Sequence, residues 1–115
     1  MDLSKIFEIE KNVDNYMSSK LAGENIDILI NNAGLSMRAS CLNHSLEKDV
    51  YMLNVNLVAV IALTKAVLKY MIKKNNGHLV AISSLQGKLG IIDRTTYAAS
   101  KHGVVGYFDS LRAEV

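Results

Sequence analysis

Two short apolar runs separated by a long helical pattern constrain the fold of this chain most strongly. "IDILINNAG" at residues 26–34 and "HLVAISS" at residues 78–84 have the length and composition of buried strands. Between them, helical patterning begins at Ser45, whose hydroxyl is expected to cap the helix, and ends at "KKNNG", residues 73–77. Two strands joined by a helix form a βαβ unit, which requires a parallel strand pair and a right-handed crossover.

Helical spacing also precedes and follows this unit. Apolar residues recur every three or four positions over residues 4–21, and residues 96–114 look helical again. The predicted order is therefore α-β-α-β-α, the pattern of an α/β sheet. In such sheets ligands bind beyond the carboxyl ends of the strands, where "NNAG" and "SSLQG" lie.

Composition excludes several classes of protein. The chain has 115 residues, of which 50% are hydrophobic and 21% charged, as expected for a globular core. A net charge of +2 is too small to indicate binding of nucleic acid or of an anionic membrane surface. Cys41 is the only cysteine, and the three histidines lack the spacing of a metal site, so no disulfide and no metal are expected. The longest apolar run, residues 57–63, is far shorter than the ~20 residues that span a bilayer, so no membrane segment is expected in this chain.

One short segment carries a candidate catalytic pair. In "TTYAASKHG", residues 95–103, Tyr97 precedes Lys101 by four positions, so the two side chains share one helix face. A free phenol has a pKa of about 10, and a neighbouring cation lowers it toward neutrality. Such a pair also occurs often by chance on solvent-exposed helices. The spacing alone leaves both interpretations open.

Several motifs together resemble the short-chain dehydrogenase/reductase (SDR) family, in order and in spacing: Asn31-Asn32-Ala33-Gly34, Asn56, Ser84, Tyr97 and Lys101. Ser84 precedes Tyr97 by thirteen residues, as in that family. The segments "GHLVAISSLQGKLG", "YAASKHG" and "DSLRAEV" look most like the branch that holds the 11-beta-hydroxysteroid dehydrogenases and the dehydrogenase/reductase member 7 proteins. The resemblance covers essentially the whole chain and implies a Rossmann-like, doubly wound parallel sheet.

The resemblance also implies a role for each catalytic residue. Tyr97 would be the general acid/base, and Lys101 would lower its pKa and hydrogen-bond the nicotinamide ribose. Ser84 would polarise the substrate carbonyl, with its neighbour Ser83 as the rival. Asn56, an unfavourable residue within a helix, would hold a water that links Lys101 to solvent.

The implied cofactor is NADP or NAD. Asn32, Ala33 and Gly34 would line it, because small side chains let the backbone approach the ribose. Asn31 either shares this role or braces adjacent strands. Asp2 and Leu3, in "MDLSK", resemble the segment that contacts the adenine.

The family's Gly-rich phosphate turn and its substrate loop have no counterpart in the sequence. We therefore expect residues 1–115 to be the central portion of one NAD(P)-binding domain, from a fragment or a truncated gene model. The alternative function is a truncated, inactive chain that acts at most through protein association. A sugar-nucleotide epimerase or dehydratase also uses Tyr-x-x-x-Lys, but NNAG argues against it.

The resemblance implies a small or lipid-like alcohol or carbonyl substrate, such as a steroid or retinoid. It also implies a homodimer through the helices at residues 46–74 and 96–114, although the same surfaces could be buried within one subunit. Gly103 and Gly106 indicate close approach by another backbone. Localisation at the endoplasmic reticulum membrane or in the cytoplasm is expected from the family.

Overall fold

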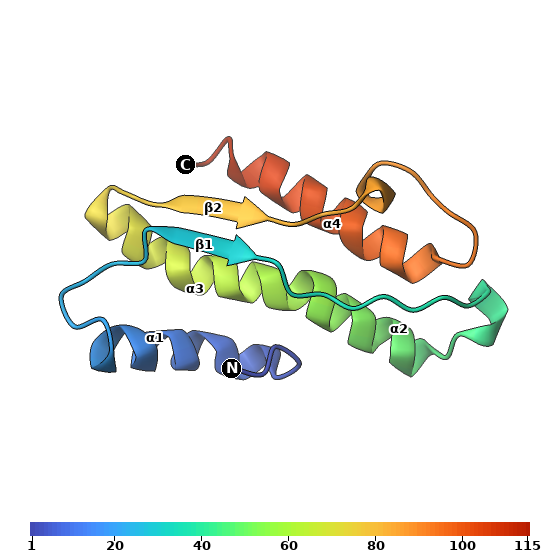
Figure 1. The fold of residues 1–115 in the computed structure, drawn as a ribbon, viewed down its shortest axis with the longest axis horizontal. Helices are drawn as coiled ribbons and strands as arrows, with labels where there is room; N and C mark the ends of the chain where they lie inside the picture. The colour runs from blue at the N-terminus through green and yellow to red at the C-terminus, as the bar shows by residue number, and fades with distance from the viewer.

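Helices cover one face of a small parallel sheet in the computed structural model, which describes residues 1–115 (Figure 1). The strands are β1 (Ile28–Asn31) and β2 (His78–Ala81). The main helices are α1 (Ile9–Ser19), α2 (Leu46–Leu53), α3 (Ala59–Lys74) and α4 (Thr95–Leu111). Short turns of helix complete the chain: η1 (Ile6–Glu8), η2 (Cys41–Asn43), η3 (Asn54–Val58) and η4 (Leu85–Gly87).

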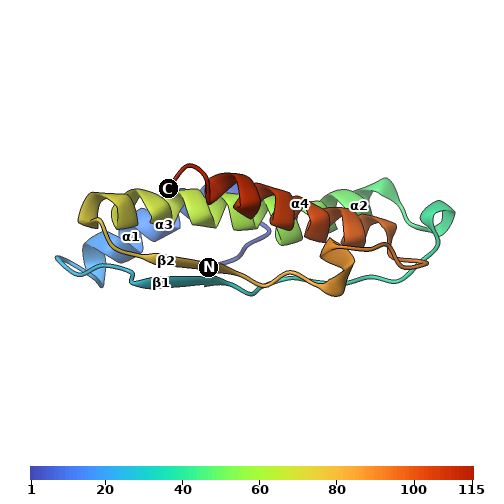
Figure 2. The same cartoon turned by 90° about the horizontal axis from the view of Figure 1, so that it is seen from above.

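The two strands pair in parallel, with Ile28 opposite His78 and Asn31 opposite Ala81. The predicted α-β-α-β-α order and the parallel βαβ unit are therefore confirmed. The predicted burial of both strands is wrong for this chain, because Ile28 and Ile30 are 59% and 57% exposed. All four helices lie on the same side of the sheet, so alternate side chains of β1 face solvent (Figure 2).

A single long helical path joins the strands, as predicted, but it contains a π turn. Helix α2 passes through η3, a π-helical turn, directly into α3. Ser45 is the residue before α2, yet its hydroxyl makes no capping bond. It hydrogen-bonds the Glu47 carboxylate instead and, after the backbone N–H of Glu47, helps to hold the pKa of that carboxyl below its usual value. The helix ends at Asn75, whose φ of 51° is left-handed, as the predicted reversal requires.

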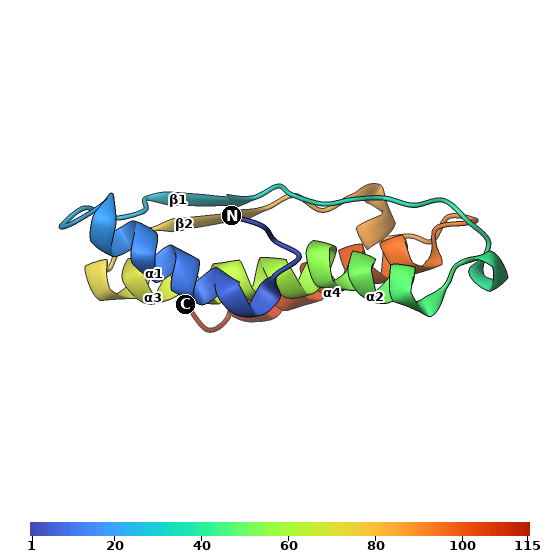
Figure 3. The same cartoon turned by 90° about the horizontal axis from the view of Figure 1, so that it is seen from below.

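Helix α1 lies alongside α3 (Figure 3). Val13 and Met17 of α1 pack against a buried apolar face of α3 formed by Ala66, Val67 and Met71. At the surface, Lys69 Nζ lies 3.0 Å from Glu10 Oε1 and 2.9 Å from Asp14 Oδ1. The hydrogen bond from Lys69, and then the one from the Tyr70 hydroxyl, lowers the pKa of Asp14. Since exposed ion pairs contribute little, the apolar contacts hold α1 in place.

The continuous helix from Leu46 to Lys74 has 29 residues and contains an 18-residue window with a mean hydropathy of 1.7, so it is long and apolar enough to cross a membrane by length and composition. The expectation that the chain has no membrane segment used only the uninterrupted apolar run at residues 57–63 and did not consider the whole helix. In the folded chain the helix contacts α1, β1 and α4, as the core helix of a sheet protein does.

The two glycines of α4 have different surroundings. A Cβ on Gly103 would lie 2.7 Å from Leu57 Cδ2, a side-chain atom of η3. A Cβ on Gly106 would meet nothing within 4 Å. The close approach of another backbone, in a homodimer or in the rest of the subunit, stays a prediction. Within this chain the tight contact is between Gly103 and the side chain of Leu57.

Asn31 at the end of β1 is buried, and its Nδ2 donates to Thr64 Oγ1 of α3 at 3.0 Å. It therefore braces β1 against α3 rather than against the neighbouring strand. We expect Asn31→Ala to lower the free energy of unfolding by about 1–3 kcal/mol, because a buried hydroxyl loses its partner. Urea denaturation of the full chain measures this change.

The matched control for that prediction is Thr64→Val, alone and combined with Asn31→Ala. If the hydrogen bond is the source of the effect, the double variant loses less stability than the sum of the two single variants. If the stability loss of the double variant equals the sum of the two single losses within about 0.3 kcal/mol, the hydrogen bond contributes nothing of its own.

Candidate active site

Several of the predicted site residues converge at the carboxyl ends of the two strands. Gly34 follows β1, Asn56 lies in η3, and Lys101 lies on α4. A Cβ built on Gly34 would lie 3.3 Å from Asn56 Oδ1 and 3.7 Å from Lys101 Nζ. The absence of a side chain at Gly34 therefore leaves the backbone open beside an amide oxygen and an ammonium group.

Asn56 ties three segments together. Its fully buried side chain accepts a hydrogen bond from Leu35 N at 2.8 Å and donates to Leu35 O at 2.8 Å. Its Nδ2 also donates to Ser100 Oγ at 3.2 Å, and Ser100 Oγ in turn donates to Tyr97 O at 2.7 Å. The amide thus links the segment after β1 to the start of α4. Both N–H groups of Asn56 are used, and its Oδ1, which accepts one hydrogen bond, keeps a second lone pair that could accept from a water.

Lys101 is a buried ammonium with unused donors. The residue is 5% exposed, and its Nζ donates to Ile82 O, just after β2, at 2.9 Å. No carboxylate pairs with it. An ammonium carries three N–H groups, so two remain for a ligand. A buried charge without a counter-ion is costly and indicates a functional requirement at this position.

Two cations lie near the Tyr97 ring. Lys101 Nζ is 5.9 Å from the ring centroid, and the Arg94 guanidinium carbon is 5.8 Å from it. Arg94 also donates to the Ser36 hydroxyl, in the segment that follows NNAG. Both cations therefore lie within cation–π distance of the Tyr97 ring.

The two serines after β2 differ in what they contact. Ser83 Oγ donates to Lys101 O at 3.4 Å. A Cβ on Gly87 would lie only 2.5 Å from Ser83 Oγ. Ser84 Oγ accepts a hydrogen bond from Gln86 N at 3.2 Å. The O–H of Ser84 has no acceptor within the protein, so Ser84 remains the candidate for contact with a substrate oxygen.

The predicted adenine contacts lie apart from this hydrogen-bonded network. Asp2 accepts hydrogen bonds from the hydroxyl and then the backbone N–H of Ser4, which lower the pKa of its carboxyl. Leu3 is half-buried, while Asn32 and Ala33 are exposed just beyond β1. No hydrogen bond joins Asp2 to the segment after β1.

Ser100 and Arg94 are site residues that the sequence interpretation did not include. Arg94, Tyr97 and Lys101 lie at positions i, i+3 and i+7, a single helix face, so that signal was available. Ser100 looked like one of three small residues between Tyr97 and Lys101. Nothing in the sequence shows that its hydroxyl joins Asn56 to Tyr97.

A sizeable groove lies away from this site. A groove of about 670 Å³ lies at the opposite end of the molecule, between the last turns of α3 and α4 and the start of β2. A cavity of about 10 Å³ lies beside Tyr97. We place the site at Tyr97 because ligands bind at the carboxyl ends of parallel strands and because the buried ammonium lies there.

The sequence profile of the short chain dehydrogenase family matches residues 1–115, the whole chain. The chain belongs to the short-chain dehydrogenase family. It is 49% identical over 90 residues to "Dehydrogenase/reductase SDR family member 7B" of Bos taurus. The matched residues make up 78% of this chain and 28% of that protein. It is also 49% identical over 90 residues to member 7C of Homo sapiens. The predicted family and branch are confirmed, and the chain spans less than a third of the length of these curated relatives.

Solved structures of the family agree with the fold. The SDR chain matches a gluconate 5-dehydrogenase from Burkholderia cenocepacia, solved with NADP and tartrate, at a TM-score of 0.92 and 27% identity, over 99% of this chain and 44% of that one. It matches the aldohexose dehydrogenase of Thermoplasma acidophilum at a TM-score of 0.89 and 24% identity, over the same shares. The Rossmann-like α/β class predicted from the sequence is therefore confirmed for this partial α-β-α-β-α segment.

Proposed function

We propose that this SDR protein transfers a hydride between NADP or NAD and the hydroxyl or carbonyl group of a small or lipid-like molecule. The buried, carboxylate-free ammonium of Lys101 beside the Tyr97 ring carries this proposal. A solvated lysine on an exposed helix would keep its charge in water. Here the cation is held at the end of both strands, one helical turn from a phenol.

The residues present suit such a cofactor. Two N–H groups of Lys101 are free for ribose hydroxyls, and the absence of a Cβ at Gly34 keeps the adjacent backbone open. In the proposal, Asn32, Ala33 and Gly34 line the ribose side, while Asp2 and Leu3 lie toward the adenine. Bound NADP or NAD supplies or accepts the hydride.

The chain's own residues then manage one proton. In reduction, the Tyr97 O–H gives its proton to the substrate's carbonyl oxygen, and Lys101 stabilises the phenolate that remains. In oxidation the same oxygen takes the proton back. The free O–H of Ser84 donates a hydrogen bond to the substrate oxygen. Asn56 fixes the geometry of the site and is proposed to help hold a water that connects Lys101 with solvent.

An apolar substrate is favoured by the connection from β2 to α4. Four large apolar side chains of this connection are exposed: Leu85, Leu89, Ile91 and Ile92. They lie on the segment that leads from Ser84 to Tyr97, at the same end of the sheet as the proposed site (Figure 1). Exposed apolar groups gathered beside a site suit a ligand with a hydrocarbon body.

We further propose that residues 1–115 form the central portion of one NAD(P)-binding domain. Homodimerisation through residues 46–74 and 96–114 is supported by exposed Val50 and Tyr51 on α2, which packs against α4. Attachment to the endoplasmic reticulum membrane, or a cytoplasmic location, remains a proposal from the family. The alternative, a truncated chain that acts by association, is favoured by the exposed Ile28 and Ile30 on the sheet.

An antibody to this segment and a cofactor titration separate the two functions. We expect a native species of ~30 kDa or more, the size of a complete dinucleotide-binding domain with its substrate region. We expect that species to bind NADPH or NADH and to oxidise it in the presence of an apolar ketone. A native species of 12.6 kDa without cofactor binding would favour the truncated, inactive chain.

A further inference from the structure

The start of α4 is held by another helix rather than by a cap of its own. Arg94, the residue before α4, makes no side-chain capping bond. The Thr96 hydroxyl, in the first turn, donates to Asp49 Oδ1 of α2. His44 Nδ1 lies 2.6 Å from the same Asp49 oxygen. We call His44, Asp49 and Thr96 the Asp49 clamp.

The Asp49 clamp is partly withdrawn from water and charged. The side chains of His44 and Asp49 are 11% and 24% exposed. Hydrogen bonds from Thr96 and then His44 lower the pKa of Asp49, so its carboxylate is ionised at neutral pH. A hydrogen bond to a carboxylate is about twice as strong as one between neutral groups. A negative charge at the positive end of α4 is also favourable.

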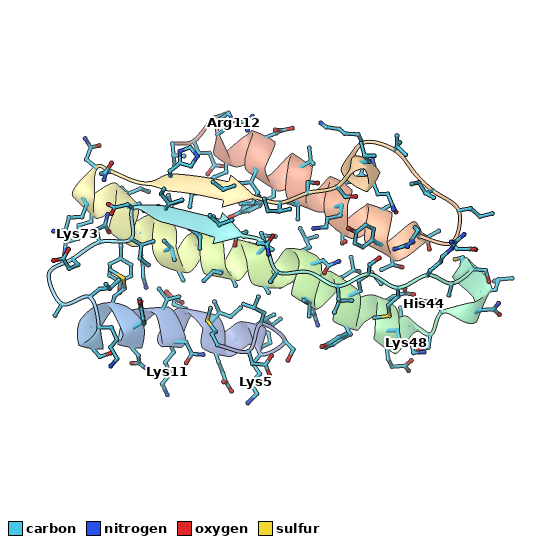
Figure 4. All side chains as sticks on the ribbon, viewed as in Figure 1. Lys5, Lys11, His44, Lys48, Lys73 and Arg112 are labelled. Atoms are coloured by element: carbon cyan, nitrogen blue, oxygen red, sulfur yellow. The ribbon has the colours of Figure 1, made fainter.

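The clamp lies directly beside Tyr97. Thr96 is its chain neighbour, and His44 lies beside α2 at the end of the molecule where α4 begins (Figure 4). The cavity of about 10 Å³ is lined by His44, Thr96 and Tyr97 together with Met52. A cavity of that size holds at most about one water, so His44 and Thr96 pack closely on this side of the first turn of α4.

We propose that Thr96, held by Asp49, is a positioning residue that sets where the Tyr97 hydroxyl lies for proton transfer. The inference rests on the proposed oxidoreductase function. Ser100 Oγ donates a hydrogen bond to the backbone carbonyl of Tyr97 and accepts one from Asn56, which is the first point of attachment of this turn. The Asp49 clamp supplies the second point of attachment, and two points fix the direction of the helix start. A displacement of about 1 Å in a reacting group can cost on the order of a hundredfold in rate.

The test compares Thr96→Val with Thr96→Ser in the full protein. Valine keeps the shape of threonine and removes the hydroxyl, whereas serine keeps the hydroxyl. We expect Thr96→Val to lower kcat about tenfold, with the KM for NADP(H) within about twofold, and Thr96→Ser to stay within about twofold in both. Equal kcat values for all three proteins, or an equal loss in both variants, would overturn the proposal.

A second pair of variants covers the case in which Thr96→Val does not fold. Asp49→Asn keeps an acceptor for Thr96 but removes the charge, and we expect it to lower kcat by a smaller factor than Thr96→Val. Asp109→Asn is the matched control, because Asp109 is an exposed residue near the other end of α4. Equal kcat values for these two variants would count against the clamp.

Hydrogen exchange makes failure of the clamp distinguishable from failure of the proposed function. In Thr96→Val, amides of the first two turns of α4 should exchange about tenfold faster than in Thr96→Ser. If the unmutated protein turns over no carbonyl substrate, the proposed function fails. Unchanged exchange in Thr96→Val would overturn the clamp itself.

Discussion

Tyr97→Phe in the full protein should lower kcat by a factor of about 10²–10⁴, the usual contribution of a positioned general acid/base. The dissociation constant for NADP or NAD should stay within about twofold, because phenylalanine keeps the ring near Lys101 and Arg94 and removes only the hydroxyl. Steady-state kinetics with an apolar ketone, together with cofactor titration by fluorescence, measure both quantities.

Tyr107→Phe provides the matched control. Tyr107 lies on the same helix, its ring packs edge-on against Phe108 at 5.4 Å, and burial raises the pKa of its hydroxyl. It is ten residues from Tyr97, toward the end of α4 away from the strand ends. We expect this variant to keep the full kcat. Retained turnover in Tyr97→Phe would remove the mechanism, and an equal loss in both variants would assign the effect to helix packing.

The element order could be predicted because its signals are local. Strand and helix periods, together with the Asn and Gly that follow residue 74, depend on short stretches of sequence. The burial of the strands could not be predicted correctly, because it depends on whether other segments cover both faces of the sheet. Only one face is covered here, and Ile28 and Ile30 are exposed.

The residue types of the candidate site could be named from the sequence, but the contacts between them could not. Motif spacing identified Asn56, Tyr97 and Lys101, and the structure brings these residues together at the strand ends. The bond from Lys101 to the Ile82 carbonyl was not predictable, because any residue supplies a carbonyl. The same is true of the Asn56 bonds to the Leu35 backbone, which depend on the path of the chain after β1.

A variant at Lys101 should separate the binding role from the proton-transfer role. Lys101→Met keeps most of the side-chain length and removes the charge and all three N–H groups. We expect kcat to fall about a hundredfold or more, because the Tyr97 phenolate loses its cation. We also expect NADP or NAD to bind about 10–100 times more weakly, because charge-assisted hydrogen bonds to the ribose are lost. Tyr97→Phe should lower kcat without this loss of affinity.

Stability gives an independent check on the same variant. A buried ammonium without a carboxylate partner is costly, so a methionine at position 101 should leave the free energy of unfolding unchanged or raise it. Lys65→Met, at an exposed position of α3, is the control and should change neither affinity nor kcat. If Lys101→Met lowered kcat but left cofactor affinity intact, Lys101 would act on Tyr97 alone. A marked loss of stability would instead mean that its bond to the Ile82 carbonyl holds α4 to the sheet, so that the buried charge serves the fold before it serves the reaction.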